Sequence, residues 1–388
     1  MKMSLSSLPF RRGSIAALLA VSFLAPSPAF AGKPTINDGN TRISSNENPY
    51  GFSPKALERM KAALESGNYY NQNEVADMVK LCAAKEGLPE TYILPTPGSG
   101  PVLMMAAWAY AKPGLNVVTT DTGYGQLVGA FTAHGGDAKF APLNDKLGYD
   151  FKALGKLIDA NTAIVYICNP NNPTGVLADP AELRNFIMSV PENILVFVDE
   201  AYLELADSGL KANTMSPLIK LRKNLIISRT FSKGFALAGL RAGYGAANPE
   251  VLAKLRAYYA GGPSFIAAIA AQEALKDAAY LEVIRKNYHD VRAQMQTAFD
   301  RLGVKYAVPQ GAFIYFNSGL KAPDIQKHMR EANIVIGGGR AEVSADGPAP
   351  AASRAGQSTR GEWCRVSLGT KEEMDLFLGE LTKMLGKT

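Results

Sequence analysis

Histidine and cysteine are scarce in this chain, with three of each among 388 residues. The histidines show no paired spacing of the kind that metal ligands adopt, which argues against a metal site. The cysteines, Cys82, Cys168 and Cys364, are odd in number and lie in unrelated contexts. We therefore expect buried or free thiols, although one disulfide could form in an oxidising compartment.

Runs of like charge and nucleotide-binding glycine patterns are also missing. The formal net charge is +6, and the lysines and arginines are dispersed, with no basic run interleaved with aromatic residues. This distribution argues against a nucleic-acid partner. No Gly-x-Gly-x-x-Gly turn follows a first strand, which argues against a nucleotide-binding oxidoreductase.

The N-terminus lacks acidic residues and has only a short apolar run. Residues 1–31 contain three cations and no acid, are apolar over residues 14–24 and end in the small-residue sequence Ala29-Phe-Ala31. The apolar run is too short to span a bilayer, so it predicts a secretory signal peptide rather than a stable membrane anchor. The pair Arg11-Arg12 points to the twin-arginine route, which exports folded proteins. We expect a periplasmic or secreted protein whose mature chain has a net charge of 6 − 3 = +3.

Apolar, β-branched stretches alternate with helical segments over most of the chain. The stretches that predict strands are residues 116–120, 163–167, 194–198 and 225–228. Their alternation with helices predicts an α/β fold, with a mostly parallel sheet that is covered by helices on both faces.

The expected domain organisation follows from this pattern. After an N-terminal segment over residues 32–51, we expect a large domain over residues 52–260 and a smaller α+β domain over residues 261–388. The smaller domain contains a low-complexity loop near residues 345–359. That loop is either a lid over a site or an idle surface insertion.

One lysine, Lys233, lies among hydroxyl groups where a predicted strand ends. Ligands of open α/β sheets bind outside the carboxyl ends of the strands. Thr230 and Ser232 can donate to a phosphate, and Arg241 can contact it with two N–H groups. The segment Ser228-Arg-Thr-Phe-Ser-Lys233 resembles the lysine motif of fold-type I pyridoxal-phosphate (PLP) enzymes, particularly the class I/II aminotransferases.

Two strands upstream end in polar residues that extend the resemblance. One leads into Asn169-Pro-Asn-Asn172-Pro-Thr-Gly175, and the other ends at Asp199-Glu-Ala-Tyr202. A carboxylate at the end of a buried strand needs a partner, and the pyridine nitrogen of PLP would supply one to Asp199. The resemblance implies that Asn172 and Tyr202 hydrogen-bond the 3-oxygen of PLP.

A turn before an apolar helix predicts the phosphate site. Gly98-Ser99-Gly100-Pro101 precedes residues 102–111, and backbone N–H groups at such a helix start face an anion. The resembling family usually has acidic residues after the glycine of this turn, whereas this chain has Gly100 and Pro101, so the local polar network must differ. Tyr124 falls in a segment that resembles the family's Pro-x-Tyr, whose ring stacks on the pyridine.

Further residues are assigned by resemblance alone. Arg365, in Trp363-Cys-Arg365-Val-Ser-Leu-Gly369, matches the arginine that holds the α-carboxylate of the substrate. Asn48 lies in the segment Asn46-Glu-Asn-Pro-Tyr-Gly51, which borders the substrate. Tyr69 falls where the family has a tyrosine that reaches the cofactor phosphate of the neighbouring subunit, which implies a homodimer.

The resemblance spans nearly all of the chain from about Ser45 and is closest to the histidinol-phosphate aminotransferase branch. One departure concerns the substrate. Members of that branch often have an arginine after a strand of the small domain, whereas here residues 334–336 lead into Gly337-Gly-Gly. Arg340 is a substitute that nothing in the sequence establishes, so aromatic donors are as plausible as histidinol phosphate.

We predict a PLP-dependent aminotransferase that moves an amino group from an amino acid or related primary amine to a 2-oxo acid. Lys233 would form the internal aldimine and then shuttle the proton at the α-carbon. A PLP-dependent decarboxylase or oxidase on the same scaffold is the first alternative, since positioning residues choose which bond breaks. An exported, non-catalytic ligand-binding protein is the alternative from another class.

Overall fold

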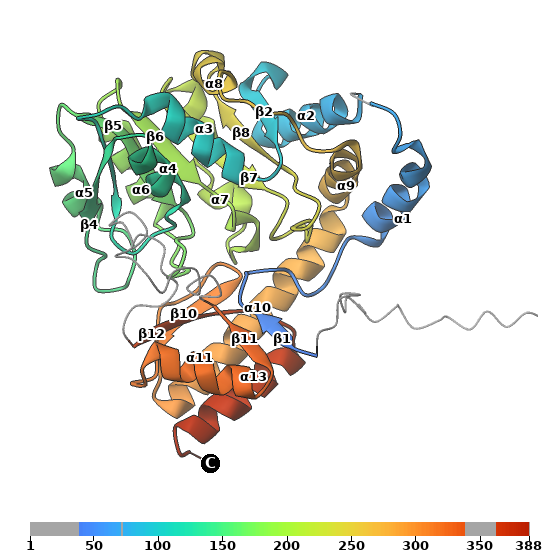
Figure 1. The fold of residues 1–388 in the computed structure, drawn as a ribbon, viewed down its shortest axis with the longest axis vertical. Coiled ribbons are helices and arrows are strands. Elements are labelled where there is room, and N and C mark those ends of the chain that lie inside the picture. The colour runs from blue at the N-terminus through green and yellow to red at the C-terminus, as the bar shows by residue number, and fades with distance from the viewer. Residues whose placement is uncertain (1–38, 71–72, 338–361, 388) are drawn as a thin grey trace, which may run out of the picture. The chain divides into compact units, whose positions relative to one another are not determined.

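The computed structural model describes residues 39–70, 73–337 and 362–387. A seven-stranded sheet forms its centre, in the order β2-β8-β7-β6-β5-β3-β4 (Figure 1). The strands are β2 (Ile93–Thr96), β3 (Asn116–Thr120), β4 (Asp137–Ala141), β5 (Thr162–Cys168), β6 (Leu195–Asp199), β7 (Leu225–Thr230) and β8 (Gly243–Ala247). The pairs from β4 through β7 are parallel, and β8 is antiparallel to both β7 and β2.

The central strands are buried on both faces, as expected for a parallel sheet covered by helices. All residues of β6 and β7 are buried. In β6, Val196 and Val198 pack into one hydrophobic cluster, whereas Leu195 and Phe197 pack into another on the opposite face. The first cluster includes side chains of α1 (Pro54–Ala63), α2 (Asn73–Glu86), α5 (Phe151–Leu157), α6 (Pro180–Ser189) and α9 (Phe265–Lys276). The second includes α3 (Gly100–Tyr110), α4 (Gln126–Ala133) and α8 (Pro249–Arg256). This arrangement confirms the predicted α/β fold.

A smaller group of elements has its own core. It comprises α10 (Ala278–Leu302), α11 (Ala322–Glu331), α13 (Lys371–Met384) and the antiparallel sheet β12-β10-β9, formed by β12 (Trp363–Ser367), β10 (Phe313–Asn317) and β9 (Lys305–Tyr306). Near the N-terminus, β1 (Thr41–Ile43) pairs in parallel with β11 (Ile334–Ile336). The described residues belong to one compact unit, and α9 packs against α1 and α2. The division into residues 52–260 and 261–388 stays a prediction.

Several absences concern the described ranges only. None of their helices is both long and apolar enough to cross a bilayer. No group of three or more histidine, cysteine or acidic side chains in those ranges is arranged to hold a metal ion. Cys82, Cys168 and Cys364 are free and buried. The predicted signal peptide, the 345–359 loop and Arg340 lie outside the described residues.

Candidate active site

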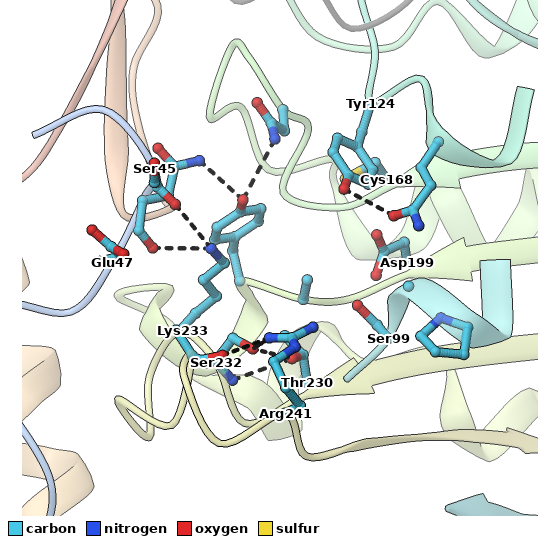
Figure 2. Close-up of a pocket in the computed structure, with 18 of the residues that line it drawn as sticks. Ser45, Glu47, Ser99, Tyr124, Cys168, Asp199, Thr230, Ser232, Lys233 and Arg241 are labelled. Atoms are coloured by element: carbon cyan, nitrogen blue, oxygen red, sulfur yellow. Dashed lines mark hydrogen bonds between the residues drawn. The ribbon is translucent and has the colours of Figure 1, made fainter. Parts of the chain in front are cut away.

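A cavity of about 550 Å³ opens where β5, β6 and β7 end, beside the start of α3 (Figure 2). Predicted residues from these strand ends and the loops after them line it: Asn172, Asp199, Tyr202, Thr230, Ser232, Lys233 and Arg241. Predicted residues from other elements also line it: Ser99, Gly100, Tyr124 and Arg365. Tertiary structure therefore brings together groups that are up to 266 positions apart, from Ser99 to Arg365 (365 − 99 = 266).

Three predicted residues do not line the cavity. Gly98 directly precedes the lining residue Ser99 and has a positive φ of 87°, and a Cβ placed there would clash with Nη2 of Arg241. The amide nitrogen of Asn48 donates to the backbone oxygens of Lys233 and Gly234, so this residue supports the lysine segment. Tyr69 is 71% exposed on the surface of the single chain.

Lys233 lies in the loop after β7, and its side chain reaches the N-terminal segment. Its Nζ donates to the backbone oxygen of Asn46 at 3.0 Å and to that of Ser45 at 3.2 Å. It also lies 5.5 Å from the ring centroid of Tyr202. Burial, with the positive charge of Arg365 as the next cause, lowers the pKa of Lys233 to about 8. A neutral, nucleophilic amine is thus accessible near physiological pH.

Asp199 is the last residue of β6 and is buried. It pairs with Ser228 of β7, whose Oγ donates to Asp199 Oδ1 at 2.7 Å. Burial raises the pKa of Asp199 to about 6, although the bond from Ser228 opposes that shift. Among the described residues no cation lies within ion-pair distance of this carboxylate. A buried, unpaired carboxylate of this kind favours a cationic ligand.

The hydroxyl of Tyr202 accepts hydrogen bonds from two asparagines. It accepts from Nδ2 of Asn46 at 3.0 Å and from Nδ2 of Asn172 at 3.4 Å. Burial raises the pKa of Tyr202, so the phenol stays protonated. Asn172 Oδ1 in turn accepts from Nη1 of Arg365 at 2.8 Å. These hydrogen bonds connect Tyr202 and Asn172 to Arg365 in β12.

Arg365 brings a half-buried positive charge to the cavity. Its Nη2 donates to the backbone oxygen of Ser44 at 2.7 Å, and its guanidinium lies 5.5 Å from the ring centroid of Phe313. Among the described residues its Nε has no hydrogen-bond partner, and no carboxylate lies within ion-pair distance. A guanidinium in this state is suited to bind the carboxylate or phosphate of a ligand.

Hydroxyls and a second guanidinium converge at the other end of the cavity. Thr230 and Ser232 share a hydrogen bond of 2.9 Å, and Nη1 of Arg241 donates to Ser232 Oγ at 3.2 Å. Nη2 of Arg241 donates to the backbone oxygen of Pro97 at 3.4 Å. Together with Ser99 at the start of α3, these groups form a site of anion-binding chemistry.

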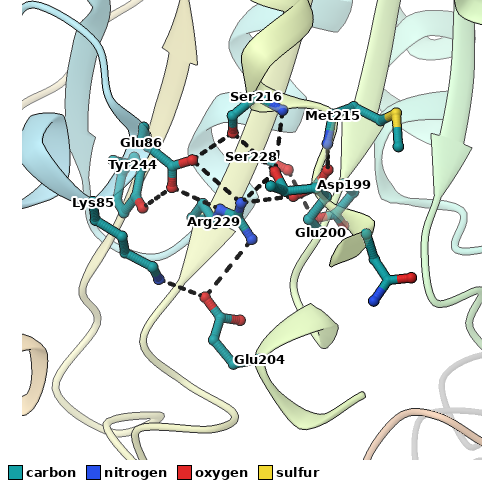
Figure 3. Close-up of polar contacts among 12 residues, drawn as sticks. Lys85, Glu86, Asp199, Glu200, Glu204, Met215, Ser216, Ser228, Arg229 and Tyr244 are labelled. Atoms are coloured by element: carbon teal, nitrogen blue, oxygen red, sulfur yellow. Dashed lines mark hydrogen bonds and ion pairs between the residues drawn. The ribbon is translucent and has the colours of Figure 1, made fainter. Parts of the chain in front are cut away.

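Sequence reasoning missed a buried charge cluster next to Asp199 (Figure 3). Arg229, between Ser228 and Thr230 in β7, is 1% exposed. Its Nε lies 2.9 Å from Glu86, its Nη2 2.7 Å from Glu200 and its Nη1 3.8 Å from Glu204. An arginine within an apolar strand was the available signal, because a buried charge requires partners.

Five further cavity residues with polar or thiol side chains were also not predicted: Ser45, Asn46, Glu47, Gln126 and Cys168. Asn46 is buried, and both its backbone N–H and its side-chain oxygen bond to the hydroxyl of Ser367 in β12. The motif at residues 46–51 predicts Asn48 as its site residue, whereas Asn46 is the one that lines the cavity. The two asparagines could not be ranked without knowing which one faces inward.

The comparison with protein families decides the assignment. The family model described as "Aminotransferase class I and II" matches residues 40–381. This chain belongs to the class I and II aminotransferases. A histidinol-phosphate aminotransferase 2 of Pseudomonas fluorescens Pf0-1 is 36% identical over 298 residues, which cover 76% of this chain and 80% of the relative. A histidinol-phosphate aminotransferase of Geobacillus thermodenitrificans is 32% identical over 348 residues, which cover 89% and 90%.

A solved structure of a relative identifies the cofactor. The histidinol-phosphate aminotransferase of Sinorhizobium meliloti in complex with pyridoxal-5'-phosphate has a TM-score of 0.76 and 26% identity, covering 89% of this chain and 91% of that one. This aminotransferase is accordingly a PLP-dependent enzyme that acts on an amino-bearing small molecule and a 2-oxo acid. The cavity fits PLP, because it combines an amine of lowered pKa, a buried carboxylate without a cation and a hydroxyl-guanidinium cluster.

The comparisons correct the predicted localisation. The relatives are named as histidinol-phosphate aminotransferases, which are biosynthetic enzymes of the cytoplasm. The expectation of a periplasmic or secreted enzyme, exported by the twin-arginine route, was therefore wrong. It rested on the charge and apolarity of a short N-terminal stretch, and these properties alone do not determine whether an export machinery accepts the chain.

Proposed function

We propose that the amino donor of this aminotransferase is histidinol phosphate or a closely similar amine with an anionic group. The observation that carries the proposal is the half-buried guanidinium of Arg365, which faces the cavity without a described carboxylate partner. It can bind the anionic group of the donor in one half-reaction and the carboxylate of a 2-oxo acid in the other. The names of the relatives support the choice of donor.

PLP, when bound, supplies an electron-poor ring that takes up the electron pair released at the substrate's α-carbon. The protein positions the reacting groups around it. Lys233, with its lowered pKa, moves the proton at the α-carbon as general base and acid. Asp199 holds a positive charge on the pyridine nitrogen, because a buried carboxylate without a cation gains most from such a partner.

The remaining site residues hold and orient the cofactor. We assign Asn172 and Tyr202 to the 3-oxygen of the cofactor, since their polar groups meet beside the amine of Lys233. Tyr124 offers a ring face for stacking. Phosphate binding is assigned to the start of α3 and to the cluster after β7: Gly98, Ser99, Gly100, Thr230, Ser232 and Arg241. Asn48 holds the lysine segment in place through its hydrogen bond to the backbone oxygen of Lys233.

An aromatic amino acid is the competing donor. In the relatives' branch an arginine is expected after the strand that corresponds to β11, whereas here β11 is followed by Gly337. A glycine leaves no side chain to bind a phosphate. An aromatic amino acid would need only the carboxylate contact of Arg365, so this departure favours it.

We also propose that the active unit is a homodimer. Tyr69 is 71% exposed in the single chain, and its neighbour Tyr70 is fully exposed at 100%. Two adjacent exposed aromatic side chains are favourable anchors for a protein interface. In the dimer, Tyr69 would reach the phosphate end of the partner's cavity.

The test is a half-reaction without a 2-oxo acid. Purified enzyme loaded with PLP is mixed with histidinol phosphate, histidinol or phenylalanine, and the loss of the visible absorption band is followed by stopped flow. The proposal expects the highest second-order rate constant of the half-reaction for histidinol phosphate, with one carbonyl product per site. A preference for phenylalanine would replace the proposed donor, and release of carbon dioxide would identify a decarboxylase.

A further inference from the structure

The turn at the start of α3 has few side-chain groups for an anion. Gly100 has no side chain, and Pro101 has no backbone N–H, so the first turn of this helix offers one donor fewer than usual. The side chain of Ser99 makes no capping hydrogen bond to α3. Some other group must complete the polar surroundings of a phosphate that binds here.

Gln126 occupies the space that a side chain at position 100 would fill. A Cβ built on Gly100 would lie 3.0 Å from Nε2 of Gln126 and 3.3 Å from its Oε1. Gln126 is the first residue of α4, a different helix, and it lines the cavity. The absence of a side chain at Gly100 is therefore what admits the amide of Gln126 to the turn.

A hydrogen bond to Tyr124 fixes the direction of this amide. The hydroxyl of Tyr124 donates to Oε1 of Gln126 at 3.0 Å (Figure 2). Burial raises the pKa of Tyr124 to about 12, so this phenol remains a donor throughout the neutral range. With Oε1 engaged, the two N–H groups on Nε2 are the free functions of the side chain, and no described residue accepts from them.

We propose that Gln126 donates a hydrogen bond from Nε2 to the phosphate of PLP and so replaces the polar side chain that position 100 lacks. The inference rests on the proposed placement of the phosphate between the start of α3 and Arg241. Gly98 supports it, because the guanidinium of Arg241 lies against that glycine as the amide of Gln126 lies against Gly100. The two glycines of the turn each accommodate a polar group from a distant segment.

The experiment compares two ligands of the cofactor-free protein. Equilibrium dissociation constants for PLP and for pyridoxal, which has no phosphate, are measured by absorbance for the wild type, Gln126→Met, Gln126→Glu and Tyr124→Phe. Gln126→Met keeps the length of the side chain without its amide. We expect it to weaken PLP binding by a factor of about ten or more and to leave pyridoxal unchanged, because a hydrogen bond to a charged group is lost.

The other variants exclude an indirect effect. Gln126→Glu places a negative charge beside the phosphate and should weaken PLP binding further than Gln126→Met does. Tyr124→Phe keeps the aromatic ring and should weaken PLP binding less than Gln126→Met. If Gln126→Met weakens PLP and pyridoxal equally, or neither, Gln126 does not contact the phosphate and the proposal is wrong. Because no amino donor is used, this result is independent of the substrate proposed above.

Discussion

The hydroxyl of Ser228, in β7, donates a 2.7 Å hydrogen bond to the carboxylate of Asp199, at the end of β6. The two residues face each other in the register of parallel strands, so the sheet itself sets this contact. The bond lowers the pKa of a carboxylate that burial raises to about 6. Ser228 thus helps to keep Asp199 ionised at neutral pH.

Ser228→Ala should therefore impair the chemical step most at low pH. Loss of a hydrogen bond to a charged group removes about 1.5–3 kcal/mol, or roughly one to two pKa units. Loss of the bond should raise the pKa of Asp199 further, and the neutral acid cannot hold a positive pyridine nitrogen. We expect the single-turnover rate at pH 7 to fall roughly tenfold and to recover in part as the pH rises. Ser228→Thr retains the hydroxyl as a control. A loss by the same factor at every pH would contradict this account.

Arg365→Gln should change the pH at which the amine of Lys233 reacts. Burial and then the charge of Arg365 lower the pKa of Lys233 to about 8, so removal of that charge should raise it. The rate at which cofactor-free protein reacts with PLP, measured by visible absorbance, rises with pH through this pKa because only the neutral amine attacks. We expect the midpoint to move upward in Arg365→Gln and to stay near 8 in Arg365→Lys. Identical midpoints in all three proteins would disprove the coupling.

Glu200→Gln should alter the pH dependence of stability. Burial raises the pKa of Glu200 to about 7 despite its ion pair with Arg229. The folded state then binds a proton that the unfolded chain has already lost, so the wild type loses stability as the pH rises from about 4.5 to 7. The Tm of Glu200→Gln, measured relative to the Tm of the wild type, should therefore increase from pH 5 to pH 8.

Glu86→Gln provides the matched control for that measurement. Burial tends to raise the pKa of Glu86, but Arg229 and other partners outweigh it and lower the pKa to about 2. Glu86 is therefore ionised at both pH values, and its removal should lower the Tm by a similar amount at each. The assignment of the raised pKa to Glu200 fails if Glu200→Gln and the wild type lose stability in parallel between pH 5 and pH 8.

Mixing two variants tests the homodimer. Tyr69→Ala should weaken phosphate binding in the partner's cavity, and Lys233→Ala should abolish catalysis in its own. In a mixed dimer, one cavity combines an intact Lys233 with an intact Tyr69 from the partner subunit. At limiting PLP, mixed dimers purified through two different tags should regain about half of the wild-type activity, since one of two symmetric sites is complete. Unrecovered activity in a verified mixed dimer would place Tyr69 outside the partner's site.

Local patterns in the sequence predicted four of the parallel strands of the large sheet, β3, β5, β6 and β7, and candidate site residues where three of them end. Strands β5, β6 and β7 are apolar because both faces are buried, and the polar residues at their ends are conspicuous for that reason. Asp199 and Lys233 could be proposed as site residues because ligands bind at the carboxyl ends of such strands.

Only the tertiary structure determined which distant groups come within bonding distance. The contact of Gln126 with Gly100, the ion pair of Glu86 with Arg229 and the bonds of Lys233 to the N-terminal segment join residues that no local pattern connects. The pKa values of Lys233 and Asp199 depend on burial and on charges from other elements. Residue type and strand pattern are properties of short segments, whereas distance and desolvation exist only once the segments pack together.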